Sequence, residues 1–397
     1  MTENTWFGVA PSDWQESRLK YLADFQAGEH ITAESIRPEA EFPVYGGNGL
    51  RGFADQYTHD GKYVLVGRQG ALCGNVNYAE GKFWASEHAV VVKPRTGVHV
   101  QWIGELLRAM NLGQYSMSAA QPGLSVEYIT NLPVLVPPFE TQRRIADYLD
   151  RETSGIDSLL AEKERLLELL AEKRRALITR AVTRGLDPAV PLRDSGLAWL
   201  GAIPEHWQVE RTKWLFRERR GRSESGDEEL LTVSHLTGVT PRSEKDVTMF
   251  EAESTEGYKI CRRGDLAINT LWAWMGAMGV SPCDGIVSPS YHVYVLSDQL
   301  DGGYVDALVR TPQFAQEVLR VSKGVWSSRL RLYPENFFEL YIHVPPLAEQ
   351  QAIVDWIGRE TGKLNALQEA AERTVGLLRD RRASLIAAAV TGKLEIT

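Results

Sequence analysis

The sequence predicts an α+β chain of two globular modules, each made of short strands and helices and each followed by a long helix. Three observations support this prediction. A long segment occurs twice, the residues before each copy are also duplicated, and each copy carries an apolar repeat of seven residues. The expected boundaries are residues 1–139 and 187–343 for the two modules, and residues 140–186 and 344–397 for the two helices.

The clearer duplication begins at a Val-Pro-Pro triplet. A shift of 208 positions carries Val136 onto Val344, and the match then continues without a gap to the end of the chain. Gln142 matches Gln350, and an Ala-Val-Thr triplet closes both copies. About two positions in five are identical, which chance does not produce. Because a Pro-Pro pair bars helix before it, each copy is expected to start a helix just after its prolines.

The helix of each copy is expected to form a coiled coil beyond a Thr-Ser-Gly break at residues 153–155. Apolar residues recur there at heptad spacing for about four heptads, with polar residues between them. The predicted seam consists of Ile156, Leu170, Leu177, Leu364, Leu378 and Leu385. Flanking residues expected to widen this seam are Leu159, Leu160, Leu166, Leu167, Leu367, Val375 and Leu377. Each helix starts at its own module and runs toward the other, so antiparallel pairing within the chain is predicted.

The modules themselves share a fainter duplication. A shift of 193 positions carries Trp6 onto Trp199, Pro11 onto Pro204 and Trp14 onto Trp207. Between the matched ends the two modules differ strongly in sequence. Similar ends with different sequences between them are expected of a pair of recognition modules, although divergence without a functional cause gives the same pattern.

Both modules read as α+β. In the first, residues 63–66 and 89–93 are predicted strands, residues 102–112 a helix, and the glycine-dense residues 45–49 a tight loop. In the second, strands are predicted at residues 230–233, 266–268 and 291–296.

Composition is that of an ordinary soluble protein with a net charge of −8. The first residues lack the apolar core of a signal peptide, and no apolar run is long enough to span a bilayer. Three cysteines without Cys-x-x-Cys spacing argue against a disulfide framework and against zinc. The expectation is a cytoplasmic protein without metal or cofactor. Acidity is unusual for a DNA-binding protein, and only local arginine clusters interrupt it.

Motifs for catalysis are missing from the sequence. Val136-Pro137-Pro138-Phe139 resembles an adenine methyltransferase motif but has valine where that chemistry needs Asn or Asp. No phosphate-binding Gly-x-x-x-x-Gly-Lys-Ser/Thr loop occurs, and the eight histidines form no metal-ligand spacing. The prediction is that the chain is not an enzyme.

With its two modules, its Val-Pro-Pro boundaries and its paired helices ending in Ala-Val-Thr, the chain resembles the DNA specificity subunit of type I restriction-modification systems. The resemblance covers essentially the whole chain. The second copy closes as Ala-Val-Thr-Gly-Lys-Leu at residues 389–394, whereas the first departs slightly with Arg-Gly-Leu at residues 184–186.

This resemblance implies two target recognition domains, each reading one half of a bipartite site in double-stranded DNA. It further implies one copy of this chain per complex, assembled with two methyltransferase subunits and, through them, with restriction and translocase subunits. Methylation and cleavage then belong to the partners, which also supply phosphate contacts that an acidic chain lacks. No membrane is implied.

The helix pair is expected to act as a ruler. Residues 154–183 form a helix of about 45 Å at ~1.5 Å per residue. That length corresponds to roughly 13 base pairs, which accommodates two short half-sites and a gap. Two readings from other classes stay open: a self-sufficient DNA-modifying enzyme, and a structural coiled-coil adaptor.

Loops that follow strands are expected to carry the base contacts, because a rigid scaffold presents variable side chains there. Arg forks onto guanine, Gln pairs with adenine, and Glu accepts a hydrogen bond from cytosine. Candidates in the first module are Tyr45, Asn48, Arg68, Gln69, Glu87 and His88. Candidates in the second module are Ser234, His235, Asn269, Trp272, Trp274, Lys323, Ser327 and Arg329.

Overall fold

The computed structural model describes residue 7 and residues 11–116, 123–245, 254–324 and 330–396. The chain divides into two compact units. The first unit comprises residues 1–165 and 372–397, and the second comprises residues 166–371. Each unit therefore contains one module together with part of each long helix. None of the helices described is long and apolar enough to cross a membrane.

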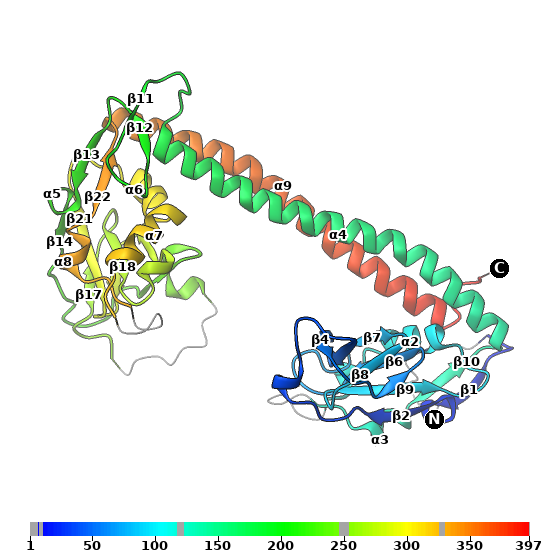
Figure 1. Cartoon of the computed structure of the whole chain (residues 1–397). Helices are drawn as coiled ribbons and strands as arrows, with labels where there is room; N and C mark the ends of the chain where they lie inside the picture. Colours follow the sequence, from blue (N-terminus) through cyan, green and yellow to red (C-terminus); the bar gives the residue numbers. More distant parts are fainter. Residues whose placement is uncertain (1–6, 8–10, 117–122, 246–253, 325–329, 397) are drawn as a thin grey trace. The chain divides into compact units, whose positions relative to one another are not determined.

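The first module is built on two four-stranded sheets (Figure 1). One sheet has the strand order β2-β9-β6-β7 and the other β4-β3-β8-β5, while β1 pairs with β10. The first sheet consists of β2 (Ala23–Ala27), β9 (Ala89–Pro94), β6 (Tyr63–Gly67) and β7 (Val76–Ala79). The second consists of β4 (Gly49–Ala54), β3 (Phe42–Gly46), β8 (Lys82–Ala85) and β5 (His59–Asp60). The remaining elements are β1 (Gln15–Arg18), α1 (Leu19–Leu22), η1 (Ala33–Ser35), α2 (Val100–Ala109), η2 (Leu112–Tyr115), α3 (Val126–Thr130) and β10 (Pro133–Val136).

The second module repeats the sheet β2-β9-β6-β7 and the pair β1-β10, which we call the common frame, but its described residues form no second four-stranded sheet. Its four-stranded sheet has the order β14-β21-β18-β19, and β13 pairs with β22 as β1 does with β10. That sheet consists of β14 (Phe216–Glu218), β21 (Tyr291–Leu296), β18 (Leu266–Asn269) and β19 (Met278–Val280). Smaller pairs are β11 (Leu192–Asp194) with β12 (Ala202–Pro204), β15 (Leu231–Ser234) with β16 (Gly238–Pro241), and β17 (Lys259–Cys261) with β20 (Gly285–Val287). The other elements are β13 (Gln208–Arg211), α5 (Thr212–Leu215), η3 (Arg242–Glu244), η4 (Ala273–Met275), α6 (Gly302–Val309), α7 (Pro312–Val321), α8 (Pro334–Phe337) and β22 (Tyr341–Val344).

The predicted strands are confirmed. They form because their residues are β-branched and apolar and become buried in the sheets. Val64, Leu65 and Val66 are all fully buried in β6, one of the two inner strands of its sheet, since helix α2 covers one face and β8 lies over the other. Matched registers show the common frame. In the first module Leu65 lies opposite Val91, and in the second Ala267 lies opposite Val293.

Two long helices complete the chain: α4 (Phe139–Arg184) and α9 (Leu347–Val390). Both begin within three residues of the expected starts. The predicted break at residues 153–155 is wrong, because α4 continues through it. A mid-helix glycine costs only about 1 kcal/mol. The turn before it is held by Ile145 and Leu149, which are buried in the core of the first module.

The helices pair within each unit. In the first unit Arg379 contacts Glu164 at 2.8 Å and Arg382 contacts Asp157 at 2.7 Å. In the second unit Arg174 donates to Asn365 at 2.6 Å. Since these partners run in opposite directions along the sequence, the pairing is antiparallel and intramolecular, as predicted.

The coil seam follows the predicted heptad positions with one correction. Ile156, Leu170 and Leu364 are buried, and Leu177, Leu378 and Leu385 are half-buried. Of the flanking residues expected to widen it, Val375 is buried and Leu160 and Leu167 are half-buried. The other four are exposed, namely Leu159, Leu166, Leu367 and Leu377. The row of buried and half-buried residues alternates steps of four and three from Ile156 and from Leu364. Each of the four exposed leucines directly precedes a position of that row, so its side chain points outward.

A duplicated glutamine fixes each helix to its module. Gln142 is 1 % exposed; its amide donates to the Pro137 carbonyl at 3.0 Å and accepts from the His99 amide at 2.9 Å. Gln350 is 0 % exposed and makes the same pair of bonds to Pro345 and to Asp301, both at 2.8 Å. The identity seen in the sequence therefore reflects a joint that closes the backbone before each helix.

Each module also receives the end of a helix. In the second unit the Val182 carbonyl of α4 accepts hydrogen bonds from the Tyr304 hydroxyl, at 3.1 Å, and from His343 Nε2. His343 stacks on Trp207 with ring centroids 5.3 Å apart. Complete burial lowers the pKa of His343 to about 4, so the ring is neutral near pH 7.

The first unit builds the same receptacle from apolar groups. Ala389 and Val390 of α9 are buried there, in the core that also contains Trp102. The duplication places Trp102 at the position of Tyr304 and buried Leu135 at that of His343. The helix ends are nearly identical in sequence, whereas the sites that receive them differ in polarity.

Candidate nucleic-acid interface

Three loops of the first module converge at one end of its strands. They are the turn between β3 and β4, the residues that follow β6, and the turn between β8 and β9. Two backbone bonds join them: the Arg68 amide donates to the His88 carbonyl at 2.8 Å, and the Ser86 amide donates to the Tyr45 carbonyl at 2.9 Å. All six candidates of the first module thus lie on these adjoining segments, which we call the polar tip: Tyr45, Asn48, Arg68, Gln69, Glu87 and His88. The ring of Tyr45 is turned to the core, where it packs edge-on against buried Phe83 with ring centroids 5.7 Å apart.

Glycine allows the loops of the polar tip to approach so closely. The residues 45–49 that were predicted to be a loop form the end of β3, a two-residue turn and the start of β4. A Cβ at Gly47 would meet the His88 carbonyl oxygen at 3.0 Å. Gly49 has a φ of 93°, a conformation that side chains disfavour. The close approach was predicted correctly, but Gly46 and Gly49 are strand residues.

The side chains of the polar tip are partly pre-oriented. His88 Nδ1 lies 3.2 Å from Gln69 Oε1, which leaves the Gln69 amide nitrogen available to a ligand. Asn48 Oδ1 accepts from Asn75 at 3.2 Å. The Arg68 guanidinium has no hydrogen bond or ion pair within the described part of the chain. Arg68 and Gln69 therefore combine an anchored backbone with free donors, as direct base readout requires.

Glu87 is the acidic member of the tip. Its carboxylate lies 3.2 Å from His30 Nδ1 and 3.5 Å from His88 Nε2. Burial by itself raises the pKa of Glu87, but backbone hydrogen bonds and the two histidines outweigh it, so the pKa is lower than usual. The carboxylate is consequently ionised near neutral pH, and the two imidazoles have a fixed acceptor beside them.

The second module presents an aromatic tip instead, defined by Leu271, Trp272, Trp274 and Met275 after β18. The two tryptophan rings stack with centroids 6.3 Å apart at 26°. Trp274 donates its indole N–H to the Leu271 carbonyl at 3.0 Å, whereas Trp272 is 51 % exposed. Stacking and apolar contact with base methyl groups are the chemistry that such a surface offers.

Asn269 does not belong to the set that faces solvent. It is 6 % exposed, and its amide nitrogen donates to the Val233 carbonyl at 3.3 Å and to the Tyr291 hydroxyl at 3.0 Å. Its oxygen accepts from the Leu271 amide. The side chain thus ties the end of β18 to β15 and positions the aromatic tip. Burial at a strand end could not be distinguished from exposure by sequence alone.

The remaining candidates are more scattered. Ser234 ends β15 and accepts from the Leu236 amide at 3.2 Å, and His235 beside it is exposed. Lys323 is exposed and its backbone bridges to Arg331. Ser327 and Arg329 lie outside the described residues.

Three residues outside the predicted candidates also contribute to the polar tip. Asn75 contacts Asn48, Asn77 lies against Gly49, and His30 contacts Glu87. Asn75 and Asn77 follow Gly74 with strand alternation, which is the one signal that points to them. Within the described residues, no three His, Cys, Asp or Glu side chains are grouped so that they could hold a metal ion.

Comparison with known proteins agrees with this architecture. Residues 11–169 match the family model for the type I restriction modification DNA specificity domain. The Escherichia coli type I restriction enzyme EcoprrI specificity subunit is 44 % identical over 146 residues, an alignment that covers 35 % of this chain and 36 % of that protein. A putative type I specificity subunit of Haemophilus influenzae is 22 % identical over 84 % of both chains.

One solved structure shares the fold over nearly the whole chain. It comes from work on complex assembly and conformational transition of the type I restriction-modification system, and it covers 97 % of this chain and 100 % of its own with a TM-score of 0.64 at 16 % identity. Residues 11–169 are thus similar to the type I restriction modification DNA specificity domain, and the chain as a whole shares the fold of that solved structure.

Proposed function

We propose that this chain is the non-catalytic DNA-recognition subunit of a type I restriction-modification complex. The observation that carries the proposal is the repetition of one frame with two different tips. The strand order and register of one four-stranded sheet and the glutamine joint are the same in both modules, whereas the polar tip and the aromatic tip share no side chains. Each module then reads one half of a bipartite site.

In this function the polar tip reads base edges in the major groove. Arg68 supplies a guanidinium fork for guanine, Gln69 an amide for adenine, and Glu87 an acceptor for cytosine. The aromatic tip reads its half-site through contact and shape, with Trp272 as the exposed ring. Methyl transfer and cleavage belong to partner subunits, and the helix pair binds two methyltransferase subunits.

The helix pair sets the gap between half-sites. Insertion of one heptad into each helix lengthens it by about 10 Å, which corresponds to about three base pairs. The expected result is a wider gap with unchanged half-sites when methylated adenines are mapped in cellular DNA. A changed half-site with an unchanged gap would show that the helices do not measure distance.

The function itself is tested by mapping methylated bases in cells that carry the complete system, with and without this chain. A bipartite motif that disappears with the chain supports recognition. Methylation by the purified chain alone would instead indicate a self-sufficient enzyme, and a complex that binds DNA without sequence preference would indicate a structural adaptor.

A further inference from the structure

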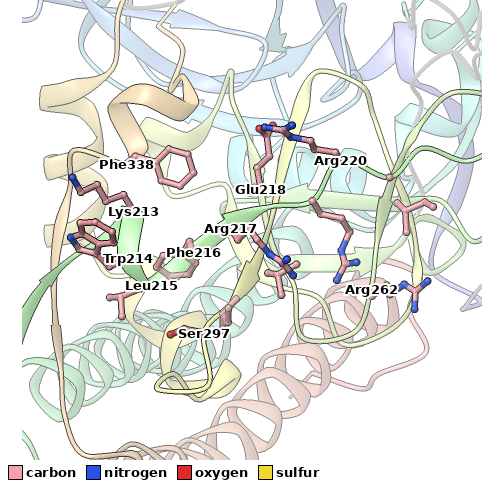
Figure 2. A pocket seen from close by; sticks show the side chains of 15 residues that line it. Lys213, Trp214, Leu215, Phe216, Arg217, Glu218, Arg220, Arg262, Ser297 and Phe338 are labelled. Carbon is pink, nitrogen blue, oxygen red and sulfur yellow. The ribbon is translucent and has the colours of Figure 1, made fainter.

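The second module contains a basic groove that the recognition tips do not use. It has a volume of about 1040 Å³ and lies along β14, which forms an edge of its four-stranded sheet. Figure 2 shows Arg217, Arg220 and Arg262 at one end of this groove and Lys213, Trp214 and Phe338 at the other. Lys213 and Trp214 belong to α5, and Arg217 belongs to β14. Arg220 follows β14, Arg262 lies in the turn before β18, and Phe338 follows α8.

A buried ion pair holds together the two segments that line the groove. Arg219 donates to both carboxylate oxygens of Asp265, at 2.5 and 2.8 Å, and Asp265 is only 2 % exposed. Asp265 also accepts from the Arg262 backbone amide at 2.8 Å. Because this carboxylate joins β14 to the turn before β18, the arginines of the two segments line one surface.

The charge of the groove is left unbalanced. The side chains of Arg217, Arg220 and Arg262 make no ion pair or hydrogen bond with the described residues. The acidic lining residue, Glu218, lies 3.3 Å from His292. Lys213 Nζ lies 4.6 Å from the ring of Trp214, which is 69 % exposed. Free cations beside an exposed aromatic ring are concentrated here in a chain whose net charge is −8.

The first module lacks this feature at the corresponding place. The frame puts Asp24 where the second module has Arg217, and Ala27 where it has Arg220. The Asp24 carboxylate is bound by Arg95 at 2.7 Å. The basic edge is therefore a property of one module and not of the shared frame.

We infer that the groove along β14 binds the phosphodiester backbone of duplex DNA, next to the half-site that the second module reads. Guanidinium groups donate paired hydrogen bonds to phosphate, and such contacts add affinity without base preference. The inference rests on the proposed DNA-recognition function and adds a second, sequence-independent contact to it. It also gives an acidic chain a cluster of free cations with which to hold DNA.

The test uses the complex assembled with its methyltransferase subunits. Arg217→Gln, Arg220→Gln and Arg262→Gln are combined, and binding to cognate and unrelated duplexes is measured over a range of salt concentrations. Each phosphate contact contributes about 0.9 to the slope of log affinity against log salt, so the slope should fall by about 2–3. Affinity for both duplexes should fall by the same factor, which leaves base discrimination unchanged.

Two further variants separate charge from structure. Replacement of the same three arginines by lysine keeps the charge and should retain most of the slope. Arg95→Gln is the matched control in the first module, and it should leave the slope unchanged because Asp24 already binds that guanidinium. Thermal melting of each variant identifies any that fail to fold. If the triple glutamine variant does not fold, the three single glutamine variants carry the test, and each should lower the slope by about 0.9.

Specific binding by the triple glutamine variant with an unchanged slope would overturn the groove assignment while leaving the recognition function intact. Loss of a methyltransferase subunit at unchanged DNA affinity would also overturn it and would show that the groove binds an acidic protein surface. Absence of sequence-specific binding by the unmodified complex would overturn the proposed function itself.

Discussion

The two modules have the same backbone frame, but their chemistry differs at three places. The first carries a polar tip, an apolar receptacle for the end of α9, and an edge strand whose Asp24 is neutralised by Arg95. The second carries an aromatic tip, a polar receptacle around His343, and a basic edge strand. Frame residues are buried and bonded in pairs, so they tolerate little change, whereas tip and edge residues face solvent and are free to diverge.

The coil seam is where the largest effect is expected. Leu170→Asp buries a carboxylate at a position that is 8 % exposed, which should lower the free energy of unfolding by about 4 kcal/mol. Its counterpart Leu378→Asp, half-buried in the first unit, should cost less. Leu169→Asp is the neighbouring control at 45 % exposure and should change stability by under about 0.5 kcal/mol. Denaturant unfolding measures all three, and equal effects would mean that the seam is placed wrongly.

The glutamine joints should respond equally in both modules. Gln142→Leu and Gln350→Leu each leave a buried amide and at least one buried carbonyl without a partner, at a cost of about 3 kcal/mol. Unfolding of the two variants tests the symmetry of the frame. An unchanged free energy of unfolding for either variant would contradict the symmetry, because that module would then hold its helix through other contacts.

The receptacles should differ in their dependence on pH. The pKa of His343 is lowered by burial to about 4, so the unfolded chain binds a proton between about pH 6.5 and 4 while the folded chain does not. His343 therefore lowers the free energy of unfolding by about 2–4 kcal/mol as the pH falls through that window, and it has no such effect above the window. His343→Gln should remove that contribution and flatten the profile of stability against pH. An unchanged profile would show that the imidazole is protonated in the folded protein.

The tips should affect separate half-sites. Arg68→Ala or Gln69→Ala should cost about 1–3 kcal/mol of binding and relax discrimination in one half-site only. Trp272→Ala should weaken the other half-site. Competition binding against every single-base variant of the mapped site provides the measurement. Full affinity and unchanged discrimination for both first-module variants would show that the loop with Arg68 and Gln69 is a turn without a role in recognition.

Duplication made the frame predictable from the sequence. Identity at Gln142 and Gln350 marked the joints, heptad spacing marked the seam, and β-branched runs marked the central strands. Periodicity does not report which flank of a helix faces its partner, and Leu159 and Leu377 were therefore placed in the seam although they are exposed. A helix held at its ends by packing also passes through Gly155 despite its low propensity.

The candidate interface was less predictable. Its first-module members were found because they follow strands, and strand ends meet at one end of a sheet. Asn269 was assigned to the surface because sequence does not show whether a polar side chain is consumed internally. The basic groove could not be predicted from the sequence. Its two segments, residues 217–222 and 262–263, are far apart along the chain and are joined only in the fold, through Arg219 and Asp265.

A single exchange tests most directly the claim that each module reads one half-site. Residues 204–343 are replaced by a second copy of residues 11–135, whose ends correspond in the frame, so that α4 enters a receptacle already suited to the Ala-Val-Thr end of α9. Methylated adenines are then mapped in cells that carry this chain with its partners. The account predicts an inverted repeat of the first half-site with the original gap. Persistence of the original asymmetric site, or a motif unrelated to its first half, would contradict it.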